Sequence, residues 1–176
     1  MHGNKIIFIG RYTKQKNPLL ALKIMNEIKK MKFNCHLDMY GEGSLLSDMQ
    51  SYIKKNNLTD YVSIHKPTAD IRKVYKQSDL LLMPSSFEGC VLSKVEANAF
   101  SIPCVLRNWG QNILDVTDFS ESEVIDGTNP KKYAEKIIEM LNSKKLIQYK
   151  KKAYEYSKKF QIEPIIQKWI AFLDNC

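Results

Sequence analysis

The sequence lacks the features that define several large protein classes. Its four cysteines, Cys35, Cys90, Cys104 and Cys176, are far apart and form no Cys-x-x-Cys pair. This spacing argues against a zinc site or a disulfide framework and is typical of a reducing compartment. No apolar run approaches the ~20 residues of a membrane-spanning helix, and the first residues, MHGNKIIFIG, show no signal-peptide pattern. We therefore expect a cytoplasmic protein.

Motifs of other nucleotide-binding and hydrolytic proteins are also missing. There is no Walker A lysine motif and no Gly-x-Ser-x-Gly elbow. Gly41-Glu-Gly43 matches only part of a dinucleotide fingerprint, because the third glycine is absent. The histidines have no metal-ligand spacing and no Asp-x-Asp pair occurs, so we expect no required metal and no other cofactor.

The charge balance is basic, with 27 Lys and Arg residues against 19 Asp and Glu residues and a formal net charge of +8. Such a surface attracts phosphates, nucleic acids or anionic membranes. Much of the excess lies in KKLIQYKKKAYEYSKK, which in the simplest interpretation is a solvated helix face. Peripheral contact with the inner membrane face is the alternative. Nucleic-acid binding is not expected, because the sequence has no RNP, helix-turn-helix or finger motif.

Short apolar runs alternate with segments of helical periodicity, in a composition whose 44% hydrophobic residues suffice for one soluble domain. The predicted strands are residues 5–10, 35–41, 62–65, 80–84 and 103–107. The predicted helices are residues 18–32, 44–56, 71–79, 91–100, 130–142, 144–159 and 163–174, the last with an apolar core face. The alternation predicts an α/β fold with a Rossmann-like, doubly wound parallel sheet and extra C-terminal helices.

Ligands of such sheets bind outside the carboxyl ends of the strands, so the loops after the strands are the candidate site. The loop after the first strand offers Arg11 and Lys16. The segment FEGCVLSKVEANAF places Glu88 and Glu96 in the most apolar part of the sequence. Burying an unpaired carboxylate there is costly, so both carboxylates are expected to face water or to have a partner.

These residue types fit one extended ligand. Unpaired N–H groups at the start of the helix after Glu88 favour an anion, and Gly89 allows close approach of the backbone. A diphosphate held there and by the two cations would leave the carboxylates to accept hydrogen bonds from sugar hydroxyls. The pattern therefore indicates a nucleotide-sugar.

Three segments resemble a known family: GRYTKQKNPLLAL, MYGEGSLLSDMQSYIKKNNLTDYVSIH and SDLLLMPSSFEGCVLSKVEANAFSIPCV. They resemble the C-terminal, donor-binding half of retaining glycosyltransferases with the GT-B fold, in glycosyltransferase family 4, group 1 type. The resemblance runs from about Lys5 to Leu141. It rests on Gly-Arg-(four residues)-Lys, then a strand ending in Pro-Ser, then Glu-(seven residues)-Glu.

The resemblance implies a role for each matching residue. Arg11 and Lys16 would bind the donor diphosphate and stabilise the leaving phosphate. Glu88 would contact the hydroxyls of the transferred sugar, and Glu96 those of the ribose. The remaining donor-binding positions would be Gly10, Lys66, Gly89, Cys90, Val91 and Leu92. Transfer would retain the anomeric configuration, with the leaving phosphate as base and no enzymic nucleophile.

The sequence departs from the family pattern at two places. Val91 stands where many relatives have a second glycine, and Asn108-Trp-Gly-Gln-Asn-Ile has one glycine and no acid where the family often has Gly-Gly and Glu. The second departure concerns how the far side of the donor sugar is held.

The resemblance also implies partners. Residues 1–176 would be the nucleotide-sugar binding domain, including C-terminal helices at about 144–176. The N-terminal acceptor domain would be absent from this chain or be a separate chain. The last helix often packs on that domain in the family, so its absence would leave part of the apolar face of residues 162–173 exposed. The isolated domain would then transfer little of a hexose to its polysaccharide or glycolipid acceptor. The alternatives are a non-catalytic nucleotide-sugar-binding subunit of an acceptor-binding chain and a GT-B sugar-nucleotide epimerase.

Overall fold

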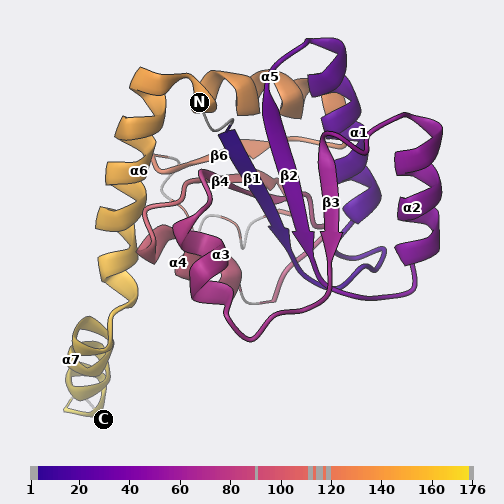
Figure 1. Cartoon of the computed structure of the whole chain (residues 1–176). Helices are drawn as coiled ribbons and strands as arrows, with labels where there is room; N and C mark the ends of the chain where they lie inside the picture. The colour runs from indigo at the N-terminus through magenta and orange to yellow at the C-terminus, as the bar shows by residue number, and fades with distance from the viewer. Residues whose placement is uncertain (1–3, 90, 111–112, 114–116, 118–119, 175–176) are drawn as a thin grey trace.

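A parallel sheet organises the chain (Figure 1). The computed structural model describes residues 4–89, 91–110, 113, 117 and 120–174. Among these residues, six strands pair in the order β3-β2-β1-β4-β5-β6, all in parallel. The strands are β1 (Asn4–Ile9), β2 (Cys35–Tyr40), β3 (Val62–His65), β4 (Leu80–Met83), β5 (Cys104–Arg107) and β6 (Ser122–Ile125). The predicted Rossmann-like fold is confirmed.

The order of the strands reverses between β1 and β4. The chain first builds outward from β1 through β2 to β3, and then returns to the other side of β1 with β4. Ile6 accordingly pairs with Leu37 of β2 and with Leu80 of β4. A crevice forms where the strand order reverses, and this is where ligands of such sheets bind. The loops after β1 and β4 are therefore the best placed for a site.

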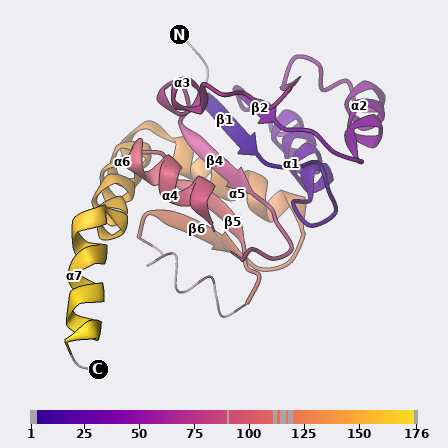
Figure 2. The same cartoon turned by 90° about the horizontal axis from the view of Figure 1, so that it is seen from below.

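Helices cover both faces of the sheet (Figure 2). Ile6 and Phe8 of β1 pack with α1, α2 and α5, whereas Ile7 packs with α3 and α4 on the opposite face. This explains why β4 and the second part of β1, residues 6–9, are apolar, since a central strand is buried on both sides. The helices are α1 (Pro18–Lys30), α2 (Leu46–Lys55), α3 (Ile71–Lys76), α4 (Leu92–Ala99), α5 (Pro130–Leu141), α6 (Ser143–Ser157) and α7 (Ile162–Leu173).

One strand of the sheet was not predicted from the sequence. Residues 122–125, Ser-Glu-Val-Ile, form β6, which pairs with β5 at the edge of the sheet. The strand has only four residues, two of them polar, and so it lacks the apolar run that reveals the central strands. Cys104 of β5 is buried, whereas Cys90 lies outside the described residues.

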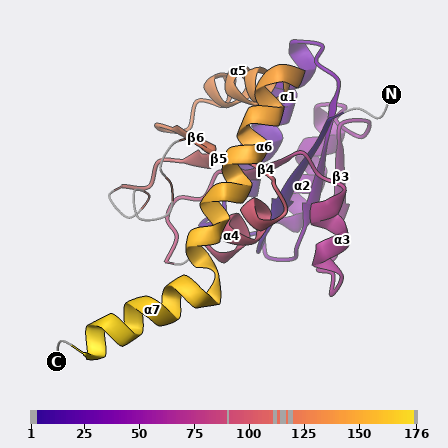
Figure 3. The same ribbon diagram turned by 90° about the vertical axis from the view of Figure 1, so that its left-hand side faces the viewer.

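Helix α7 extends away from the rest of the chain (Figure 3), and the prediction of a buried apolar face on it is wrong. Ile162 is 62% exposed and Trp169 is 61% exposed. The helix follows a 3-10 turn, Lys158–Phe160, that directs it off the sheet, so the face expected to pack on a core has no cover within the described part of the chain. No helix of that part is both long and apolar enough to cross a membrane.

Candidate functional site

The loop after β1 is held against the ends of β2 and β3. The Gly10 amide donates to Tyr40 O at 3.1 Å, and a Cβ at Gly41 would lie 2.0 Å from Gly10 O. Only glycine therefore fits at position 41. The buried Tyr12 hydroxyl donates to Met39 O at 2.8 Å, with His65 O at 3.2 Å. Gly41 thus serves close backbone packing, which replaces the partial dinucleotide fingerprint as its explanation.

Lys16 and Glu88 meet at the point where the strand order reverses. Lys16 Nζ donates to both oxygens of Glu88, at 2.8 and 2.7 Å. The Glu88 side chain is only 4% exposed and that of Lys16 is 20% exposed. The pair therefore accounts for one of the two carboxylates in the apolar segment, because the buried charge has a cation bound to both of its oxygens.

Backbone contacts hold the loops after β1 and β4 together around this ion pair. The Ser86 amide donates to Gln15 O at 2.7 Å, and Gln15 Nε2 donates to Phe87 O at 3.3 Å. The stem of Lys16 passes over Gly10, with its Cγ and Cδ 3.5 Å from where a Cβ would be. The ammonium group is thus directed from one loop to the carboxylate of the other.

The Glu96 carboxylate is held by a hydrogen bond from a buried residue. It is exposed on α4, and its Oε2 accepts a hydrogen bond of 2.9 Å from the Tyr75 hydroxyl. Tyr75 belongs to α3 and is only 1% exposed. Burial, together with this hydrogen bond to Glu96, raises the pKa of Tyr75, so the hydroxyl keeps its proton and remains a donor. The second carboxylate is therefore fixed at one oxygen and open to water elsewhere.

The start of α4 offers polar backbone to the same edge of the sheet. The helix begins at Leu92, after Val91, and no described side chain caps it. Its first N–H groups consequently lack intrahelical partners, and the helix dipole favours an anion in front of them. A Cβ at Gly89 would meet no atom within 4 Å, so close packing within the protein does not require a glycine there. Cys90, the other residue predicted here, lies outside the described residues.

The remaining predicted residues follow β1 and β3, which are separated in the sheet by β2. Arg11 and Lys66 are exposed just after β1 and β3, and the described part of the chain shows no hydrogen bond or ion pair for either side chain. Arg107, at the end of β5, was not predicted, and its Nη1 donates to Ser86 Oγ at 3.2 Å. Arg107 could have been predicted from its position at the end of a strand, because the loop after β5 lies on the same edge of the sheet as the other predicted residues.

Comparison with known proteins shows the family of the chain. The family model for glycosyl transferases group 1 matches residues 1–160. The chain belongs to this family.

Two curated glycosyltransferases match the chain over nearly its whole length. The amylovoran biosynthesis glycosyltransferase AmsD of Erwinia amylovora is 23% identical over 167 residues, which is 94% of this chain and 47% of AmsD. The poly(glycerol-phosphate) alpha-glucosyltransferase of Bacillus subtilis is 25% identical over 97% of this chain and 26% of its own length. The chain thus spans about half or less of the length of these curated relatives.

Solved structures confirm the GT-B fold expected from the sequence. TarM superposes with a TM-score of 0.85 at 26% identity, over 97% of this chain and 35% of TarM. Anabaena HepE, solved with UDP and glucose, superposes with a TM-score of 0.85 at 16% identity, over 99% of this chain and 49% of HepE. At this identity the likeness to HepE shows the fold alone.

A buried ion pair that sequence reasoning missed holds α4 in this group 1 glycosyltransferase chain. Lys94 Nζ donates to Glu121 Oε1 at 2.7 Å and to Asn98 Oδ1 at 2.9 Å, and both charged side chains are 0% exposed. Lys94 Nζ also lies 4.4 Å from the centre of the Tyr156 ring. The pair links α4 to the start of β6 and to α6. The residues around Lys94 in the sequence do not indicate that it is buried, because a lysine in a helix is usually at the surface.

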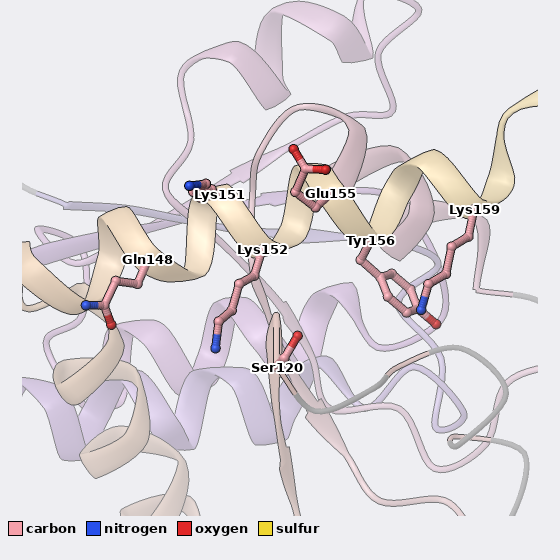
Figure 4. A pocket seen from close by; sticks show the side chains of 7 residues that line it. All are labelled: Ser120, Gln148, Lys151, Lys152, Glu155, Tyr156 and Lys159. Carbon is pink, nitrogen blue, oxygen red and sulfur yellow. The ribbon is translucent and has the colours of Figure 1, made fainter.

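A pocket of about 420 Å³ lies away from the predicted site (Figure 4). Its lining comes from α6, the residues after α6 and the residue two before β6: Ser120, Gln148, Lys151, Lys152, Glu155, Tyr156 and Lys159. It is therefore next to the amino end of β6, whereas the predicted residues follow the carboxyl ends of strands. Among the described residues, no cluster of three or more histidine, cysteine or acidic side chains could hold a metal ion.

Proposed function

We propose that this chain is the donor-binding part of a retaining glycosyltransferase and binds a nucleotide-sugar across the loops after β1 and β4. The observation that carries the proposal is the Lys16–Glu88 pair, which lies where the strand order reverses, beside the uncapped start of α4. Cationic, acidic and N–H groups meet there, and these are the groups that a diphosphate joined to two sugars requires.

In this proposal the diphosphate binds to Arg11, Lys16 and the N–H groups at the start of α4. These positive groups stabilise the charge that develops on the leaving phosphate during transfer. The backbone near Lys66 lies along the nucleotide base, and Glu96 accepts hydrogen bonds from the ribose. The leaving phosphate acts as base, and the protein supplies no nucleophile and requires no metal.

The Lys16–Glu88 ion pair implies an order of events when the donor binds. A diphosphate competes with Glu88 for the ammonium of Lys16, because both are anions that bind the same three N–H donors. A Glu88 carboxylate released in this way would stay buried and would need new hydrogen bonds. The hydroxyls of the donor hexose supply them. Lys16 thus links recognition of the phosphates to recognition of the sugar.

Calorimetry with UDP, GDP and ADP tests the proposal. S. aureus TarM and Anabaena HepE were both solved with UDP, which makes UDP the first ligand to titrate. We expect binding to one diphosphate at micromolar to millimolar concentration. Glu96→Ala should weaken binding of the nucleotide itself, whereas Glu88→Ala should not weaken nucleotide binding but should reduce the preference for the correct nucleotide-sugar.

A double variant in the pocket beside α6 is the matched control. Lys151→Ala with Lys152→Ala removes two cations from that pocket and should leave the affinity for nucleotide unchanged. No binding by a folded chain at millimolar nucleotide would refute the proposal. Loss of binding in the control but not in Glu96→Ala would move the site to α6.

The acceptor side of the reaction belongs to further protein, in the same polypeptide or in a partner chain. The chain spans about half or less of its curated relatives, and one structural neighbour is a GtfA/B complex. Transfer to a polysaccharide or glycolipid is therefore expected only when that protein is present. Co-purification of an equimolar second chain would favour the separate-subunit alternative, and epimerised labelled donor would favour the epimerase.

We also propose a cytoplasmic location with contact to an anionic membrane face. The support is the basic stretch 143–160, whose one acidic residue, Glu155, is bound by Lys158 at 2.8 Å. Vesicles of phosphatidylglycerol should sediment the chain at low salt and release it at high salt. Replacing Lys144, Lys151 and Lys152 by glutamine should lower this binding. Sedimentation that ignores salt and these changes would contradict the proposal.

A further inference from the structure

Tyr75 is placed beneath the Glu96 carboxylate in an otherwise apolar layer. Its ring stacks on that of Phe100, with 5.4 Å between the ring centres and 21° between the planes. Its hydroxyl lies 2.9 Å from Glu96 Oε2 and 3.4 Å from Ser93 O. A phenol has one proton to donate, and the shorter contact, to a charged acceptor, is the stronger hydrogen bond. Tyr75 is therefore a directed donor to Glu96.

We infer that Tyr75 is a positioning residue: its hydroxyl orients Glu96 so that the carboxylate is held ready for the ribose hydroxyls of the donor. The inference rests on the proposed role of Glu96. The hydrogen bond engages Oε2 and leaves Oε1 without a hydrogen-bond partner among the described residues. A ribose with two adjacent hydroxyls would then meet an acceptor that is already oriented.

The physical gain is preorganisation. An exposed glutamate on a helix has several rotamers, and binding a ligand through it costs the freedom of those rotamers. The anchor removes that cost before the ligand arrives. Tyr75 is itself held in place, because its side chain is buried and its ring stacks on Phe100 at the end of α4. The anchor and Glu96 are 21 residues apart in sequence, so the α3–α4 packing is what brings them together.

A purely structural role for the hydroxyl makes a different prediction. The hydroxyl of a buried tyrosine needs an acceptor in any case, and removing it could loosen α4 as a whole. Such loosening would weaken every ligand that touches α4, whether or not the ligand has ribose hydroxyls. A positioning role affects only ligands that bind Glu96 through those hydroxyls. The two roles are separated by comparing a pair of ligands.

The experiment measures the affinities of UDP and 2′,3′-dideoxy-UDP for four proteins: the unchanged chain, Tyr75→Phe, Glu96→Gln and the double variant. In the unchanged chain we expect UDP to bind about tenfold more tightly, as a hydrogen bond to a charged group implies. Tyr75→Phe should reduce this ratio to about threefold or less through weaker UDP binding, with dideoxy-UDP unchanged. In the Glu96→Gln background, Tyr75→Phe should have no further effect on the ratio.

Tyr149→Phe is the matched control. The Tyr149 hydroxyl also donates to a glutamate, Glu123 Oε1, but that pair joins α6 to β6. Its loss should leave the ligand ratio unchanged. If Tyr75→Phe weakens both ligands equally, or leaves the ratio at the level of the unchanged chain, the inference is overturned.

Failure of the proposed function gives a distinct result. If no nucleoside diphosphate binds, or if Glu96→Gln keeps the full ratio, then Glu96 does not hold the ribose. If Glu96→Gln lowers the ratio and Tyr75→Phe does not, only the positioning inference fails. Should Tyr75→Phe lose its folded circular dichroism spectrum, Phe100→Leu replaces it, because it removes the stacked ring and keeps the hydroxyl. The ratio should stay about tenfold in Phe100→Leu, and a fall to about threefold would overturn the inference, because packing and not the hydroxyl would then set the ratio.

Discussion

The buried Lys16–Glu88 pair makes a quantitative prediction. Lys16→Met keeps most of the side-chain volume and removes the charge, which leaves the Glu88 carboxylate, 4% exposed, without its cation. Removing one partner of a fully buried ion pair costs roughly 3–5 kcal/mol. Because Lys16 is itself 20% exposed, water can reach the pair, and we expect a loss of about 2–4 kcal/mol in the free energy of unfolding.

Urea and thermal denaturation followed by circular dichroism measure this loss. For a domain of this size the expected fall in melting temperature is roughly 6–12 °C. Glu88→Gln in the Lys16→Met background removes the stranded charge and should restore most of the stability, since an unpaired charge costs more than an unpaired amide.

The matched control is an ion pair with the same distance and greater exposure. Lys30 Nζ lies 2.7 Å from Glu27 Oε1, but the Lys30 side chain is 62% exposed. Lys30→Met should therefore cost less than about 1 kcal/mol. The reasoning is refuted if Lys16→Met costs no more than Lys30→Met, or if Glu88→Gln fails to restore stability. In the proposed site, Lys16→Met should also weaken nucleotide binding, and Lys30→Met should not.

Three further predictions concern the rest of the chain. Lys94→Met should destabilise it by roughly 3–5 kcal/mol in urea, and Glu121→Gln should recover part of the loss, because the Lys94–Glu121 pair is fully buried; an unchanged midpoint would contradict this. Burial raises the pKa of Cys35 and of Cys104 from 9.0 to about 12, so the stability these thiols confer is complete below pH 9 and is lost as the pH rises toward 12. Both thiols should resist iodoacetamide at pH 8 in buffer and react in urea, and equal rates would contradict their burial. Trp169→Glu with Phe172→Glu should lower concentration-dependent self-association in sedimentation without lowering the melting temperature, because both side chains are 61% exposed; a lower melting temperature would show that α7 packs on the core.

Local pattern was enough to predict the regular part of the fold. Strand β4 and residues 6–9 of β1 are continuous apolar runs, and α1 has an apolar residue on every turn, so each shows its burial in its own residues. The rule that loops follow parallel strands onto one edge then placed Arg11, Lys16 and Lys66 there. Strand β6 was not predicted, because it has only four residues at the edge of the sheet, two of them polar, and therefore lacks a clear hydrophobic pattern.

For the candidate site, the sequence indicated residue types but not which side chains pair. That Glu88 in an apolar segment needs a partner follows from the cost of burying a charge, but the sequence offers 27 basic residues to choose from. The partner, Lys16, is 72 residues away and is chosen by the packing of the loop after β1 on the loop after β4. The same holds for the anchor of Glu96 by Tyr75.

The sequence by itself determined the α/β class, the family and the edge of the sheet where chemistry-bearing residues gather, since these depend on short-range periodicity and motif spacing. Only the tertiary structure decided which charges meet, that Lys94 is a core residue, and that the apolar face of α7 lies open. The physical reason is the same each time. A side chain's period along the chain reports which way it points from its own element, whereas its partner and its burial depend on elements that the fold brings from elsewhere in the sequence.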